Sequence, residues 1–148
     1  MAIYLNNNVG VKLATHGALT TPSIDISAYV SAVTLTQTSD EIEVTSMGDT
    51  AHKFAIGLGS SQLTLDFFND WAGSAVMQTL GDAYGESLSV SMITVKGTAV
   101  SAANPTYQFN ILVNNLTPVG SGGVSDEASS SLSFTINNKV VVSPTVAF

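Results

Sequence analysis

The feature that most constrains this chain is a repeated alternation of apolar and polar residues. Alternation with a period of two places every second side chain on one face, which is typical of half-buried β-strands. The segments that show it are residues 33–38, 62–67, 88–95, 107–113 and 132–136. An Asn137-Asn138 pair then precedes Val140-Val141-Val142 and predicts a hairpin turn there. The sequence therefore predicts a mainly β fold.

One segment departs from this period. Ala72, Val76 and Leu80 recur every fourth residue, Asp70 is a candidate N-cap, and Gly81 a candidate stop. This pattern predicts one helix over about residues 70–81, and a shorter helical turn is expected within residues 23–30. A β-sandwich or barrel-like sheet with one flanking α-helix is the expected architecture. The length of 148 residues, without an internal repeat or a break in composition, predicts one domain over residues 1–148.

The charge balance excludes a nucleic-acid reader. The chain has four lysines, no arginine and eleven acidic residues, for a net charge of −7. Proteins that hold a duplex neutralise several phosphates with Lys and Arg, which this chain cannot do. Only 10% of the residues are charged while 45% are hydrophobic, which favours a surface largely covered by other subunits over the Ser/Thr-rich surface of a monomer.

No membrane segment or reactive centre is expected. The longest apolar runs are far shorter than the roughly 20 residues that span a bilayer, and the N-terminal segment lacks the basic region of a signal peptide. Neither His16 nor His52 has a recognisable catalytic partner, and cysteine is absent. The glycine-rich stretch 120–127 has too few carboxylates for a calcium loop. We therefore predict no catalytic residue, cofactor or metal site.

The order of several short motifs resembles the tail tube (major tail) proteins of long-tailed bacteriophages. The motifs are D-x-S-x-Y-V at residues 25–30, T-x-x-G-D at 45–49, G-L at 57–58 and L-x-L-D-F at 63–67. They cover roughly residues 20–80, with weaker agreement to about residue 136. The chain departs from the family pattern at residues 51–54, where it carries Ala-His-Lys-Phe and relatives more often carry arginine.

The resemblance implies a virion structural protein that is not an enzyme. It further implies synthesis in the host cytoplasm and assembly into stacked hexameric rings in the viral tail, with tape-measure, tail-terminator and tail-tip proteins as partners. DNA would be transient cargo that is not bound, because an acidic lumen repels its phosphates. Candidates to face that lumen are Asp40, Glu41, Glu43, Asp66, Asp126 and Glu127.

The stretch 38–56 is the candidate for the long loop or hairpin that reaches the next ring in this family. Its small residues would allow close backbone approach and strand addition, and Met47 could serve as an apolar anchor. The inter-ring candidates are Ser46, Met47, Gly48, Asp49 and Thr50.

Two other roles suit the same pattern. A phage head decoration (cement) protein, or another tail structural component, would share much of this composition. A carbohydrate-binding β-sandwich module would need exposed aromatic side chains, and Trp71 at the expected helix start is a poor candidate. Tubes or stacked rings of the purified protein would favour the tail tube, whereas discrete trimers or monomers would favour the alternatives.

Overall fold

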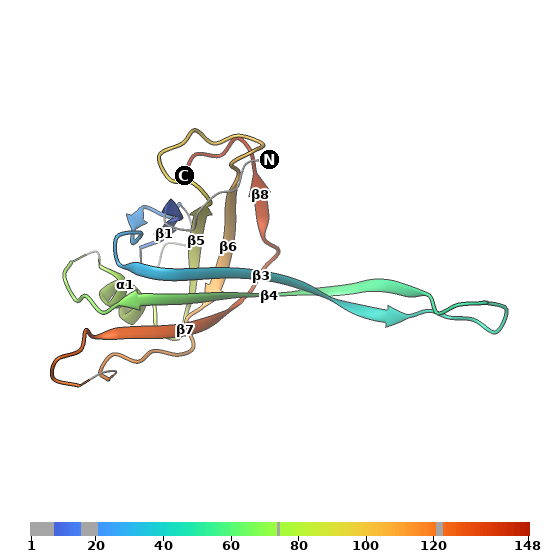
Figure 1. Ribbon diagram of the computed structural model, residues 1–148, viewed down its shortest axis with the longest axis horizontal. Helices are drawn as coiled ribbons and strands as arrows, with labels where there is room; N and C mark the ends of the chain where they lie inside the picture. The colour runs from blue at the N-terminus through green and yellow to red at the C-terminus, as the bar shows by residue number, and fades with distance from the viewer. Residues whose placement is uncertain (1–7, 16–20, 74, 121–122) are drawn as a thin grey trace.

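A computed structural model describes residues 8–15, 21–73, 75–120 and 123–148, and its strands dominate (Figure 1). The elements are β1 (Gly10–Leu13), β2 (Ile24–Asp25), β3 (Val30–Glu43), β4 (Phe54–Phe68), α1 (Val76–Asp82), β5 (Ser87–Ile93), β6 (Thr106–Leu112), β7 (Ser129–Ile136) and β8 (Val141–Ser143). The predicted fold class, mainly β with one flanking helix, is confirmed. None of the described residues form a helix long and apolar enough to cross a membrane.

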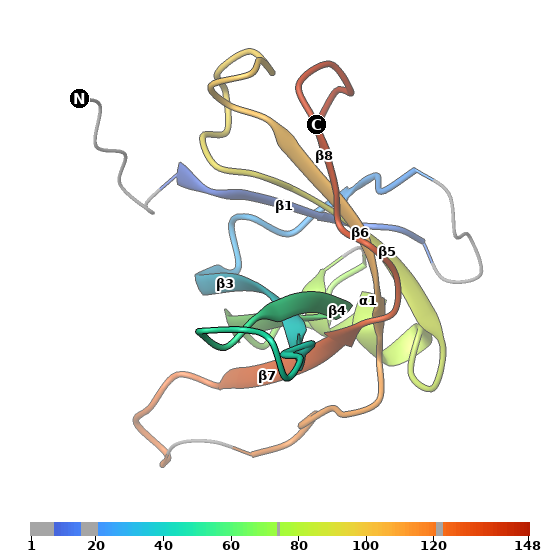
Figure 2. The same ribbon diagram turned by 90° about the vertical axis from the view of Figure 1, so that its right-hand side faces the viewer.

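The eight strands of the described residues belong to one antiparallel sheet, in the order β2-β1-β5-β6-β7-β4-β3, with β8 paired to β6. The sheet curls, so that β1, β5 and β6 form one layer and β3, β4 and β7 the other (Figure 2). Alternation produces this packing directly: in β7, Ser130, Leu132, Phe134 and Ile136 are buried while the residues between them are mostly exposed. We call this curled part of the sheet, together with α1, the body.

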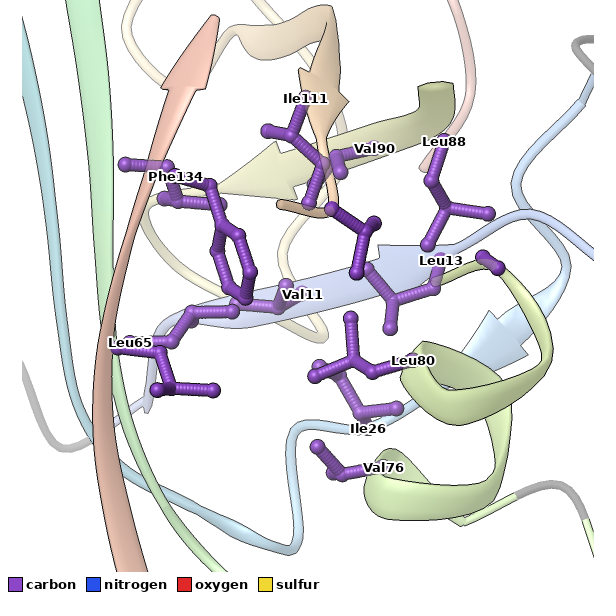
Figure 3. Packing of buried hydrophobic residues seen from close by; sticks show 14 of the residues in the cluster. Val11, Leu13, Ile26, Leu65, Val76, Leu80, Leu88, Val90, Ile111 and Phe134 are labelled. Carbon is purple, nitrogen blue, oxygen red and sulfur yellow. The ribbon is translucent and has the colours of Figure 1, made fainter. Parts of the chain in front are cut away.

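The hydrophobic core lies between the two layers and α1. Phe134 and Leu65 approach from one layer, Val11 and Leu13 from the other, and Val76 and Leu80 close one side from the helix (Figure 3). Residues 10–13 were missed as a strand because four residues are too few to show a period. They pair with β5 and bury Val11 and Leu13 completely, so this part of the N-terminal region packs on its own subunit.

The helix is shorter than predicted. It begins after Ala75 rather than Asp70, and Gly81 lies inside it rather than at its end. The Asp70 carboxylate accepts a hydrogen bond from the backbone N–H of Ala72 at 2.8 Å, which stabilises a tight turn instead of a helical start. Trp71 lies before the helix rather than within it, and its ring packs against Gly81, which has no side chain. The expected helical turn in residues 23–30 is also wrong, because β2 and a turn occupy that stretch.

The predicted hairpin at Asn137-Asn138 is wrong in its pairing. β8 pairs with β6 rather than with β7, and β7 pairs along its length with β4. The backbone N–H of Asn137 donates to the carbonyl of Asn110 at 2.8 Å, and the Asn138 side chain accepts from the N–H of Asn110 at 2.7 Å. These bonds complete the edge of β6 at the point where β7 departs from it. β7 therefore leaves β6 at this asparagine pair, and β8 pairs with β6 after it.

Candidate functional site: the projecting arm

The most distinctive feature is a long hairpin that projects from the body. β4 pairs with β7 only from Ser61 to Phe68, whereas β3 and β4 continue together to Glu43 and Phe54. We call residues 38–60 the arm. Figure 1 shows it extending far beyond the other strands. The structure therefore bears out that the stretch 38–56 forms a long hairpin. That this hairpin contacts another ring stays a prediction.

The arm has large apolar side chains that its own subunit does not cover. The exposed fractions are 59% for Phe54, 82% for Ile56 and 83% for Leu58. Directly opposite residues on paired strands share a face, so Phe54 lies beside Glu43 and Ile56 beside Glu41. This face of the arm is apolar along β4 and acidic along β3.

On the opposite face of the arm, side chains of β3 pack over the small residues of β4. Ile42 pairs with Ala55 across the strands. A Cβ added to Gly57 would lie 3.1 Å from both the Cβ of Asp40 and the Cδ1 of Ile42. The register shifts by one residue between Ser39 and Glu41, so an extra residue sits in β4 near Leu58.

A network of side chains holds the tip of the arm. The Asp49 carboxylate accepts hydrogen bonds from the backbone N–H and the hydroxyl of Ser46 at 2.7 and 2.9 Å, and it pairs with Lys53. The Glu43 carboxylate lies 2.6 Å from His52 Nδ1 and accepts a hydrogen bond from the Thr45 hydroxyl at 2.9 Å. The tip is therefore ordered by contacts within its own chain.

These contacts lower two pKa values. The pKa of Glu43 is lowered by hydrogen bonds from His52 and then Thr45. The pKa of Asp49 is lowered by its bond to Lys53 and then by those from Ser46. Both carboxylates are consequently charged at neutral pH.

The predicted inter-ring residues fall into two groups. Ser46 and Asp49 are engaged within the tip, as described above. Met47 is fully exposed at the apex, and nothing lies within 4 Å of a Cβ added to Gly48. Thr50 is exposed beside them. Met47, Gly48 and Thr50 thus remain available to another molecule, while Ser46 and Asp49 shape the turn.

One subunit does not bring the six candidate lumen acids together. Asp40, Glu41 and Glu43 lie on the arm. Asp66 lies within the body, where it accepts a hydrogen bond from the Ser131 hydroxyl. The other two, Asp126 and Glu127, lie in the loop between β6 and β7, beside the start of β7 and away from the arm (Figure 1).

The described residues offer little for chemistry. They hold no group of three or more His, Asp or Glu side chains placed to bind a metal. His52 contacts Glu43 and lies 6.4 Å from the Phe54 ring, both on the exposed arm, and His16 lies outside the described residues. The hydroxyl that joins this pair belongs to Thr45, and it donates to Glu43 rather than to His52. This arrangement suits a surface that binds another molecule.

The apolar residues of the arm were missed as site candidates, although the sequence carries a signal for them. In the run Phe54-Ala55-Ile56-Gly57-Leu58, large apolar residues alternate with Ala and Gly rather than with polar residues. Such a strand has one bulky face and one bare face. Whether its bulky face meets the core of the body or protrudes from it depends on the length of the hairpin, which the run does not reveal.

Comparisons with known proteins place the fold. No protein-family model matches the chain, and no curated protein matches its sequence. The SPP1 tail tube, solved by solid-state NMR and cryo-EM, matches with a TM-score of 0.72 at 11% identity, over 94% of this chain and 78% of that chain.

Two structures of gene transfer agent particles match as well. A chain of the native virion matches with a TM-score of 0.69 at 14% identity, over 95% of this chain and 99% of that one. A chain from the tail of the empty particle, resolved with C6 symmetry, matches with a TM-score of 0.64 at 16% identity, over the same shares. The resemblance expected from the motifs is thereby confirmed at the level of the fold, and this chain has the fold of tail tube proteins.

Proposed function

We propose that this protein is the repeating subunit of a bacteriophage tail tube. It would be a non-enzymatic virion protein that assembles with copies of itself into stacked rings, which form the conduit for genome delivery. The shared fold supports this proposal, since the matching structures come from a tail tube and from gene transfer agent particles. Residence in the virion tail follows from the same proposal.

The uncovered arm is the observation that carries the proposal. A two-stranded hairpin is marginally stable in water by itself, because it buries little apolar surface. The arm adds to this the exposed side chains of Phe54, Ile56 and Leu58. A surface of this kind is stabilised when another molecule covers it. A second copy is the natural partner for a subunit with the tail tube fold.

The arm also offers backbone groups for pairing. From Ser60 to the tip, the described strands pair with each other alone, so each has one free edge. Free edges accept strands from another chain through main-chain hydrogen bonds. We propose that the arm contacts the next ring in this way, with Met47 as an apolar anchor and Gly48 and Thr50 allowing close approach.

The acidic residues have a role in the same proposal. Each copy carries a net charge of −7, and a ring multiplies that charge around the channel. Some of Asp40, Glu41, Glu43, Asp66, Asp126 and Glu127 would face the lumen and repel DNA phosphates, so that DNA slides through without being held. Since these acids lie on the arm, in the body and on a distant loop, they would form separate acidic levels along the tube. Tape-measure, tail-terminator and tail-tip proteins would be the further partners.

Deleting residues 46–50 tests the role of the arm. The deletion removes the apex without touching the core, so the variant should fold like the wild type, as judged by circular dichroism and thermal unfolding. Negative-stain microscopy should show tubes or stacked rings for the wild type and none for the variant. Normal tubes from the variant would contradict the assigned role of the arm. Discrete trimers from the wild type would instead favour a head decoration protein.

A further inference from the structure

The two ends of the body differ in charge. At the end away from the arm, β4 finishes and β7 begins, as the pair Phe68–Ser129 defines. We call this the far end. The segments that meet there, residues 69–73 after β4 and 123–128 before β7, carry three acidic residues and no lysine: Asp70, Asp126 and Glu127.

A lysine lies at the other end, beside the root of the arm. β7 finishes at Ile136, opposite Ser61, and Lys139 follows in the connection to β8. Lys139 lines a cleft of about 570 Å³ between this connection and the arm root. Apart from Lys139, the cleft is lined by neutral groups, which include the side chains of Gln37, Thr38, Ser39, Ser61, Asn137 and Asn138.

The other three lysines already have partners in their own subunit. Lys12 Nζ lies 4.4 Å from the centroid of the Phe148 ring. Lys53 pairs with Asp49 at the arm tip, and Lys96 Nζ lies 2.6 Å from Asp25 Oδ2. Lys139 is exposed and has no ion pair or ring contact within the described parts of the chain. In a protein of net charge −7, Lys139 is therefore the lysine that can bind another molecule at the arm end of the body.

The far end offers matching carboxylates. The loop between β6 and β7 places Asp126 and Glu127 on the surface, both exposed. One oxygen of Asp126 accepts a hydrogen bond from the N–H of Gly123 at 2.7 Å, and its other oxygen has no hydrogen bond within the described part of the chain. Glu127 makes no hydrogen bond or ion pair with another described residue. Two exposed carboxylates thus stand side by side.

We propose that Lys139 of one copy binds Asp126 and Glu127 of the next copy along the tube. The proposal deepens the proposed function and rests on it. A contact between two different ends of the same molecule generates a filament when its rotation does not close a ring, and stacking along the tube is such a case. Charge pairing of this kind selects orientation, because two far ends placed together would oppose acids to acids. Lys139 would thereby set the polarity of stacking.

A charge swap provides the test. Lys139→Glu, and separately Asp126→Lys with Glu127→Lys, should each raise the critical concentration for tube formation by roughly tenfold, because each places like charges across the contact. Combining all three substitutions restores opposite charges and should return the critical concentration to within about threefold of the wild type. Lys139→Arg should assemble like the wild type, because it keeps the charge.

A matched control separates this contact from general repulsion. Thr98→Glu with Ala99→Glu adds the same two negative charges as Lys139→Glu, on an exposed loop, and should leave assembly nearly unchanged. All variants should keep the circular dichroism spectrum of the wild type. If wild-type tubes form and the charge-reversed variants assemble equally well, or the triple variant fails to recover, the pairing is refuted while the tube proposal stands. A wild type that forms no tubes or rings refutes the tube proposal itself.

Discussion

The apolar face of the arm supplies a quantitative prediction. Replacing Phe54 and Ile56 with serine removes two large side chains that are 59% and 82% exposed in the isolated subunit. Fully burying one such side chain is worth about 1.5–3 kcal/mol. Covering the exposed fractions of both would therefore contribute about 2–4 kcal/mol to each contact. That free energy corresponds to a rise of about 30- to 1,000-fold in the critical concentration for assembly.

The same substitutions should hardly affect the isolated subunit. Neither side chain belongs to the core cluster, so the free energy of unfolding should change by no more than about 0.5 kcal/mol. Sedimentation over a concentration series measures the critical concentration, and urea unfolding of the dilute protein measures stability. Val142→Ser is the matched control, since Val142 is 49% exposed but lies on β8, outside the arm. Polymerisation of the double variant at the wild-type concentration would refute the reasoning, as would an equal effect of the control.

Three further predictions concern the body and the ends of its sheet. Phe134→Ala should cost about 3–5 kcal/mol of unfolding free energy, measured in urea, because Phe134 is fully buried in the core. Gly10→Ala should cost about 1–3 kcal/mol, since a Cβ there would lie 2.5 Å from the Phe148 ring, and Phe148→Ala in the same chain should reduce that cost. Burial raises the pKa of Asp25, but hydrogen bonds from Lys96 and Ser27 outweigh it and hold the pKa below its usual 3.8. The charged Asp25 carboxylate therefore stabilises the fold at a pH above 3.8, and this stabilisation is lost as the pH falls through the lowered pKa. Between about pH 5 and pH 2, Asp25→Asn should consequently lose less stability than the wild type.

Local pattern predicted much of the sheet because its strands are half buried. In β7, alternation follows the burial of each residue, and the strand was located from the sequence within three residues of its start. β1 could not be found in this way, since Val11 and Leu13 alone do not establish a period. The start of α1 was misplaced because Asp70 can stabilise either a helix or a tight turn, and the turn is formed.

The remaining features depend on contacts between distant parts of the chain. The sequence near Asn137 indicates a turn, but the partner of β8 is set by the free edge of β6. The exposure of Phe54 and Ile56 arises because β7 stops pairing with β4 at Ser61, far from them along the chain. Likewise, the sequence does not reveal that Lys139 is the lysine left without a partner among the described residues. That follows only when the folded chain brings the other lysines to Phe148, Asp49 and Asp25. Each is a property of the folded chain rather than of a segment.

A cryo-EM map of the assembled wild-type protein tests the central proposal most directly. We predict a hollow tube of stacked rings in which Phe54 and Ile56 of each arm are buried against a copy in the adjacent ring. Acidic side chains should line the bore. Particles without a tube, or a tube in which the arms project freely into solvent, would contradict the proposal.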